Sequence, residues 1–207
     1  MTVFAVILLS PDSVLIRLVE EASPEVDSWT VLFWRGLLYA VGVSLLVFLK
    51  YRLKTLEEFK KIGKGGLLIG LFSGISTGTF VFAIVYTSIA NALVIISTGP
   101  IMIAIVSWFL LKEKSSLVTW ASMVIVFIGI YIVMSGSLGG ENLVGDFFAL
   151  ITAVMMGFTF TLTRKYKDVN MVPVNAIGGV IAALIAYVMA SKISVPPEVI
   201  KYIIAMG

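Results

Sequence analysis

Residues 65–86 read GGLLIGLFSGISTGTFVFAIVY and contain no charged side chain. About 20 consecutive, mostly apolar residues are enough for a helix to cross the hydrocarbon core of a bilayer. Glycine recurs at every fourth position, at Gly66, Gly70, Gly74 and Gly78, so the four glycines share one helix face. In lipid, a face of small residues lets two helix backbones approach closely. The stretch therefore predicts a membrane-spanning helix that packs against another helix along its glycines.

Further apolar runs of spanning length lie on both sides of this one. We place them at 2–22, 29–49, 92–111, 117–136, 145–163 and 172–190, and an eighth run begins near Val199 and is incomplete at Gly207. Hydrophobic residues make up 59% of the chain, charged residues 13%, and the mean hydropathy is +1.07. A soluble domain carries about 25% charged residues. We therefore expect an all-α polytopic membrane protein with seven transmembrane helices and the start of an eighth.

Basic residues gather in the connections on one side of this map. The segments 50–64, 112–114 and 164–167 hold six, two and three lysines or arginines, whereas acidic residues gather at 20–27 on the opposite side. Because positively charged connections stay in the cytoplasm, we expect a multi-pass protein of the cytoplasmic membrane with its N-terminus inside the cell. The longest connection, 50–64, is expected to lie as a basic helix on the bilayer surface, with lipid as its partner.

Missing residue types narrow the chemistry. The chain has no cysteine and no histidine, which excludes disulfides, thiolate nucleophiles, Ser-His pairs and HExxH zinc sites. No phosphate-binding loop is present, so ATP is not expected to drive the protein directly. We expect no cofactor, no metal ion and no nucleic-acid partner.

A helix-start pattern interrupts the first apolar run at Ser10-Pro11-Asp12. A carboxylate at mid-membrane costs about 2.5–3.5 kcal/mol on insertion scales, so Asp12 should be paired, protonated or in contact with water. Counted along the helices, Asp12 lies roughly 15 Å below the outer end of its span, and Arg35 roughly 9 Å below the outer end of the next span. A long arginine side chain can cover that difference. Two interpretations remain open: a structural ion pair beside a proline kink, or a carboxylate that lines a substrate or proton path.

Three sequence stretches carry a resemblance to a known family. They are DSWTVLFWRGLL (27–38), YTSIANALVIISTGPIMIAIVSWFLLKEKSS (86–116) and GDFFALITAVMMGFTFTLTRKY (145–166). Together they resemble the EamA-like proteins of the drug/metabolite transporter superfamily, with the strongest matches at Arg35, Pro100, Glu113 and Gly145-Asp146. The resemblance implies ten helices in two five-helix repeats, with a small-molecule path between the repeats.

The resemblance also implies a division of the chain. Residues 1–138 would form the first EamA-like repeat, and residues 139–207 an incomplete second repeat of a longer protein. An odd number of spans per repeat inverts the second copy in the membrane, and inverted repeats around a midplane site are a common plan of transporters.

From these observations we expect an integral membrane secondary transporter of small organic metabolites, and not an enzyme. The expected substrate path consists of Asp12, Arg35, Tyr39, Thr79, Tyr86, Asn91 and Pro100. A non-transporting membrane scaffold or assembly subunit is the alternative, and a homodimer stays open. Intramembrane aspartyl proteolysis would need two facing aspartates, and Asp12 with Asp146 is the candidate pair. However, Asp146 lies at a helix start, where an acid is expected because of the helix dipole.

Overall fold

The computed structural model describes residues 26–113, 116–136, 142–190 and 193–196, and in these ranges it contains helices and no strands. In chain order the elements are α3 (Ser28–Tyr51), the 3-10 helix η1 (Arg52–Lys54), α4 (Thr55–Lys61), α5 (Gly63–Tyr86), α6 (Ile89–Ile96), α7 (Gly99–Leu111), α8 (Leu117–Gly136), α9 (Leu143–Lys165) and α10 (Met171–Met189). The expectation of an all-helical chain is confirmed over these ranges.

Five helical stretches are long and apolar enough to cross a membrane. They are Ser28–Lys61, Gly63–Tyr86, Ile89–Leu111, Leu143–Lys165 and Met171–Met189, and α8 holds a shorter apolar stretch at Leu117–Ile132. Each corresponds to a run predicted from the sequence. The predicted runs at 2–22 and from Val199 onward lie outside the described residues, so the count of seven spans and the start of an eighth stays a prediction.

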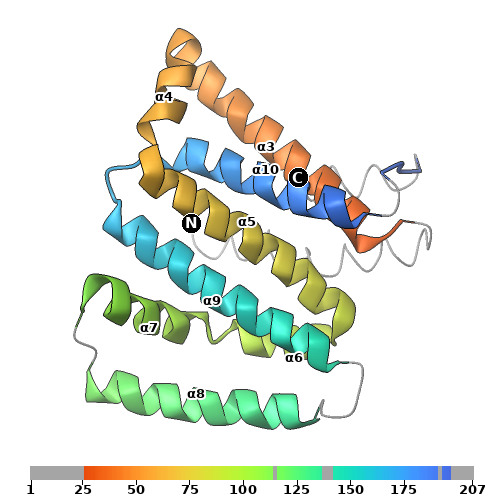
Figure 1. Cartoon of the computed structure of the whole chain (residues 1–207), viewed down its shortest axis with the longest axis vertical. Coiled ribbons are helices and arrows are strands. Elements are labelled where there is room, and N and C mark those ends of the chain that lie inside the picture. The colour runs from red at the N-terminus through yellow and green to blue at the C-terminus, as the bar shows by residue number, and fades with distance from the viewer. Residues whose placement is uncertain (1–25, 114–115, 137–141, 191–192, 197–207) are drawn as a thin grey trace.

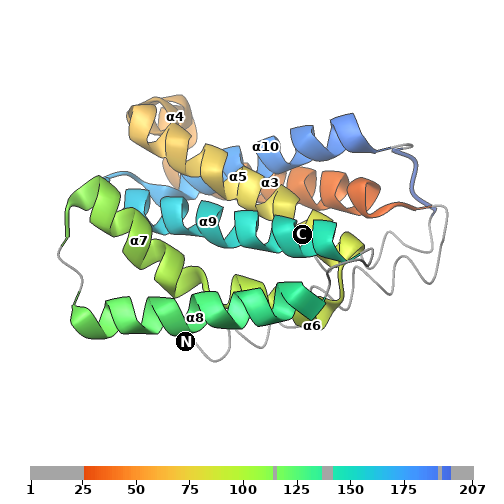
Figure 2. The same ribbon diagram turned by 60° about the horizontal axis from the view of Figure 1, so that its bottom comes forward.

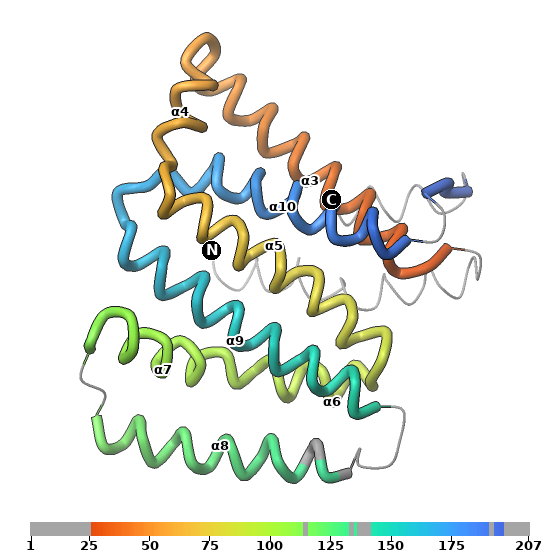
Figure 3. The backbone as a smooth tube through the Cα atoms, viewed as in Figure 1, coloured from red at the N-terminus to blue at the C-terminus, as the bar shows by residue number. Residues whose placement is uncertain are grey.

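The helices lie beside one another in an order that differs from their order in the chain. Across Figure 1 the order is α3, α10, α5, α9, then α6 with α7, and finally α8, and each helix packs against its neighbours in this row. Figure 2 shows α8 at the edge of the row, next to α6 and α7. The tube in Figure 3 shows that α10 enters between α3 and α5, which are connected through α4.

Glycines allow α10 to lie close to both of its neighbours. A Cβ atom on Gly36 of α3 would lie 2.8 Å from the carbonyl oxygen of Gly179, and one on Gly179 would lie 2.9 Å from the carbonyl oxygen of Gly36. On the other side, a Cβ atom on Gly74 of α5 would lie 2.7 Å from Cβ of Ile181. The backbones are therefore in direct van der Waals contact, which is the interaction that holds helices together in lipid.

The fourth predicted span is broken into α6 and α7. Pro100 has no N–H group to donate to the carbonyl of Ile96, and its ring would clash with that carbonyl in a continuous helix. The chain turns instead at Thr98, whose N–H and hydroxyl both donate to the carbonyl of Ile95, at 3.1 and 2.6 Å. The uncoiled step between the two helices is visible in Figure 1.

The basic connection between α3 and α5 is tied to the start of α10. The Asn170 side chain accepts a bond from the N–H of Val172 and donates to the hydroxyl of Tyr51 at 3.1 Å and to Glu58 at 3.3 Å. Glu58 also accepts a hydrogen bond from Lys61 at 2.6 Å. The bond from Lys61 lowers the pKa of Glu58 most, and the bond from Asn170 lowers it further. A single asparagine thus joins the end of α3, α4 and the first turn of α10.

Candidate functional site

A cavity of about 390 Å³ lies between α3, α5, α6 and α9. The described residues that line it are Arg35, Ser73, Ser76, Thr77, Phe80, Ile96, Thr152, Met156, Thr159 and Phe160. Arg35 is the one ionisable side chain among them. Small-molecule sites usually measure about 300–1,000 Å³ and combine an apolar wall with a few polar groups, and this cavity fits that description.

A second cavity, of about 350 Å³, lies between α3, α5 and α10. Its described lining is Leu32, Arg35, Gly36, Tyr39, Ser73, Thr77, Asn175, Gly178, Gly179 and Ala182. Arg35, Ser73 and Thr77 line both cavities. These three residues therefore form the boundary between the two spaces.

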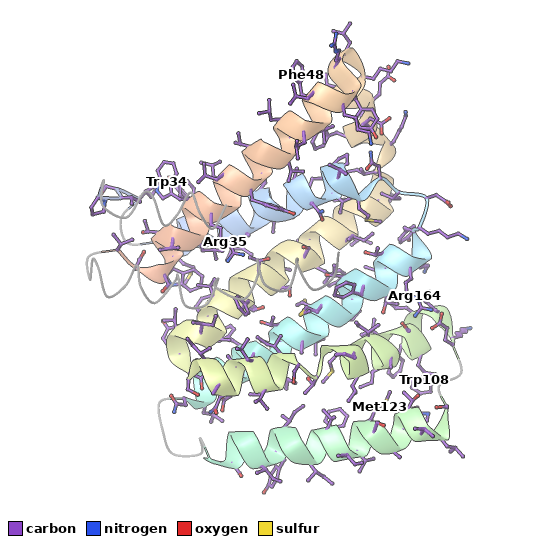
Figure 4. The ribbon with its side chains drawn as sticks, turned by 180° about the vertical axis from the view of Figure 1, so that it is seen from behind. Trp34, Arg35, Phe48, Trp108, Met123 and Arg164 are labelled. Atoms are coloured by element: carbon purple, nitrogen blue, oxygen red, sulfur yellow. The ribbon has the colours of Figure 1, made fainter. Side chains whose placement is uncertain are left out.

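Arg35 reaches this position from the side of α3 that faces the other helices. In Figure 4 it lies towards the middle of the bundle, whereas Phe48 on the same helix points outward. Placing a guanidinium at membrane depth costs several kcal/mol unless it faces polar groups or water. The hydroxyls of Ser73 and Thr77 and the adjoining cavities supply such surroundings.

Several cavity hydroxyls donate their hydrogens to the protein itself. Thr77 donates to the carbonyl of Ser73 at 3.1 Å, and Thr159 donates to the carbonyl of Met155 at 2.9 Å. Across the contact of α5 with α9, Ser76 lies 3.4 Å from the carbonyl of Thr152. Serine and threonine in membrane helices commonly make such bonds to the carbonyl one turn earlier. The oxygen lone pairs of these hydroxyls remain available as acceptors.

The residues predicted for the path do not all meet at these cavities. Arg35 and Tyr39 both line the second cavity. Thr79 donates to the carbonyl of Ile75 at 3.0 Å and accepts a bond from Thr152 at 2.8 Å, which joins α5 to α9.

The other predicted path residues lie further from the cavities. Tyr86 ends α5 and its ring stacks on Phe82, and Asn91 lies in the first turn of α6, where its N–H donates to Ser88. Pro100 is absent from the described lining, although it causes the break that follows Ile96, a cavity residue. Asp12 lies outside the described residues, so its predicted pairing with Arg35 stays a prediction.

Sequence reasoning missed the contribution of α9 and α10. Thr152, Met156 and Thr159 line the first cavity and recur at spacings of four and three, which place them on one helix face. This stripe of residues could have been recognised in the sequence by its period. Asn175, which lines the second cavity, is an amide in an apolar run and carried no further signal.

Outside the two cavities, each end of α9 makes a polar contact with a neighbouring part of the chain. At its start, the buried carboxylate of Asp146 accepts a hydrogen bond from Thr87 at 2.7 Å, and a Cβ atom on Gly145 would clash with the backbone nitrogen of Thr87. At its end, Arg164 forms a salt bridge with Glu113 at 2.8 Å. Glu113 and Gly145-Asp146, at which the sequence resembles the EamA-like family, therefore lie where α9 contacts neighbouring parts of the chain.

Comparison with known proteins gives one matching family and one curated relative. The model described as the EamA-like transporter family matches residues 2–135. A protein of Clostridium kluyveri described as "Uncharacterized transporter" is 28% identical over 170 residues, which cover 75% of this chain and 55% of that protein. The chain therefore spans about half the length of this curated relative. No solved structure matches the chain. Since the family model covers well over half of its residues, the chain belongs to the EamA-like transporter family.

Proposed function

We propose that the protein is a secondary transporter, which moves small organic solutes across the cytoplasmic membrane by alternating access past Arg35. The family and the transporter-named relative support a membrane transporter. The single observation that carries the proposed path is the position of Arg35, a charged residue shared by two cavities inside a row of apolar helices. Intramembrane charges of this kind commonly mark solute or ion pathways.

The contact between α3 and α10 supports the proposed inverted repeats. Gly36 and Ala40 of α3 meet Gly179 and Ala183 of α10 reciprocally, as expected of two helices related by a local two-fold axis. When the chain is aligned with itself so that Gly179 pairs with Gly36, Ala183 pairs with Ala40. The same alignment pairs α9 with the predicted apolar run at 2–22. The proposed whole is a ten-helix protein whose second repeat begins at α9.

Alternating access requires helices that can move against one another. The glycine contacts of α10 with α3 and α5 offer smooth surfaces for rocking, and the break between α6 and α7 lies beside the first cavity at Ile96. Broken helices near a midplane site are a recurring device of secondary transporters. Proton coupling through Asp12, exchange and facilitated passage are all compatible with this proposal.

Transport in reconstituted vesicles tests the proposal. Purified protein, in the form that its cell produces, is incorporated into liposomes and screened for uptake and efflux of radiolabelled amino acids, nucleosides and organic cations. We expect protein-dependent movement of at least one solute class and its loss in Arg35→Ala. A folded protein that moves none of these classes would favour the scaffold alternative.

A further inference from the structure

The polar groups of the first cavity are divided by their hydrogen-bonding character. Arg35 can only donate, because a guanidinium carries five N–H groups and no acceptor. Thr77 and Thr159 already direct their hydroxyl hydrogens to backbone carbonyls of their own helices, at 3.1 and 2.9 Å. Ser76 does the same across to the carbonyl of Thr152. The described lining therefore presents a cationic donor from α3 and a set of acceptors from α5 and α9, beside the Ser73 hydroxyl, which can donate or accept.

Such a division selects a solute with complementary groups. We infer that the first cavity binds a small carboxylic acid that also carries a hydrogen-bond donor, such as an amino acid or a hydroxy acid. The carboxylate lies against Arg35, and the ammonium or hydroxyl group donates to the lone pairs of Thr77 and Thr159. This inference rests on the proposed transport function, which supplies the reason for a solute to enter.

The charge of the site favours a carboxylate over a phosphate. A guanidinium matches either anion with two parallel N–H bonds, and five N–H groups allow it to keep another partner on its second edge. A phosphate monoester carries a charge of about −1.5 to −2 at neutral pH and three acceptor oxygens. Arg35 is the single cation among the described lining residues of both cavities, and a carboxylate places one negative charge beside it where a phosphate monoester places up to two.

The remainder of the cavity wall accommodates an apolar substituent. Phe80, Met156 and Phe160 line it from α5 and α9 and offer no charged or amide group. Methionine is an adaptable wall residue, because its unbranched side chain fits apolar groups of different shapes. The site therefore recognises the carboxylate and the donor strictly and tolerates variation in the side group.

Counterflow in proteoliposomes tests the inference with matched solutes. A labelled mixture of amino acids and hydroxy acids is screened first, together with uridine and choline, which lack a carboxylate. Leucine is then compared with leucinamide, which lacks the carboxylate, and with 4-methylpentanoate, which lacks the amine. We expect carboxylates that carry a donor to be transported, and each deletion to lower transport about ten- to a hundredfold, the effect of losing a hydrogen bond to a charged group.

A variant separates recognition from structure. Thr159→Val keeps the shape of the side chain and removes its acceptor, so it should weaken transport of leucine and leave that of 4-methylpentanoate unchanged. Thr163→Val is the matched control, since Thr163 makes the same type of backbone bond on α9 and is absent from the described lining. Equal losses for both solutes in Thr159→Val would contradict recognition of the donor.

The outcomes distinguish the inference from the proposed function. The inference is overturned if uridine or choline is transported and no carboxylate is, or if leucine and leucinamide are transported equally. Either result still shows that the protein is a transporter. Absence of protein-dependent movement of every solute in the set overturns both.

Discussion

At the scale of single residues, Arg35 has the most unusual place in the molecule. It lines both cavities, and in each of them Ser73 and Thr77 lie beside it. Among the described lining residues of the two cavities, Arg35 is the one that carries a full charge.

The predicted pair of Asp12 with Arg35 is open to a double-mutant test. Asp12→Asn should leave the protein folded and impair transport, whereas Arg35→Ala should be less stable, because breaking a buried pair costs about 3–5 kcal/mol. The double variant Asp12→Asn with Arg35→Gln should regain stability relative to Arg35→Ala without regaining transport. Thermal unfolding and vesicle uptake provide the two measurements. If both properties return, the pair is structural alone, and strictly additive stability losses would exclude contact, since contacting residues couple by about 0.5–3 kcal/mol.

Gly74 allows a second prediction at this scale. A Cβ atom there would lie 2.7 Å from Cβ of Ile181 and 2.8 Å from the carbonyl oxygen of Gly178. Gly74→Leu should therefore push α5 away from α10 and lower the melting temperature of the purified protein, by the equivalent of about 1–3 kcal/mol or more. Gly42→Leu is the control, because a Cβ atom at Gly42 meets nothing within 4 Å. Equal melting temperatures of the two variants would show that α5 does not touch α10 at this face.

At the scale of helices, α9 is held by polar contacts at its two ends and by small residues between them. Asp146 joins its start to the end of α5, Arg164 joins its end to Glu113, and Ala149 and Ala153 are fully buried between these points. Polar contacts near the membrane surfaces cost less desolvation than they would at the midplane. They therefore set the position of α9 along its axis, while its middle remains free to line the cavity.

The contact at the start of α9 can be tested by removing its acceptor. Asp146→Ala leaves the Thr87 hydroxyl without this buried partner and should cost about 1–3 kcal/mol of stability. Asp146→Asn keeps an acceptor and should cost less, and Asp168→Ala, at an exposed position, should have little effect. Chemical denaturation in detergent measures the three variants. A loss in Asp168→Ala as large as that in Asp146→Ala would contradict this role of Asp146.

At the scale of the whole molecule, the row of helices from α3 to α8 places its basic connections together. α4, the end of α7 and the end of α9 lie on the same side of the bundle in Figure 1. They carry Lys60 and Lys61, then Lys112, and Arg164 with Lys165. This agrees with a common cytoplasmic surface for these three connections.

The proposed orientation in the membrane predicts where reporters will be accessible. Reporters at the N-terminus and at 112–114 should be cytoplasmic, and one after Gly139 should be outside, because the basic connections remain inside. Cysteines introduced at 50–64 and labelled from outside intact cells give an independent measurement, since the natural chain has no cysteine. Labelling of 50–64 from outside would reverse the whole arrangement.

The sequence by itself determined the helices, because a bilayer forces each backbone polar group to bond within its own helix over a stretch of fixed length. The predicted run 65–86 and α5 agree within two residues at one end, whereas the predicted run 92–111 is divided before Pro100, which lacks an N–H. Only the tertiary structure decided which helices are in contact. A stripe of small residues predicts that a helix packs closely against another, but it does not identify the other helix. The same limit applies to the cavity. Thr79 and Thr159 look alike in sequence and both bond to their own helix backbones, yet Thr79 meets Thr152 and Thr159 lines an open space. That difference depends on the rotation of each helix against its neighbours, which arises only when all of them pack together.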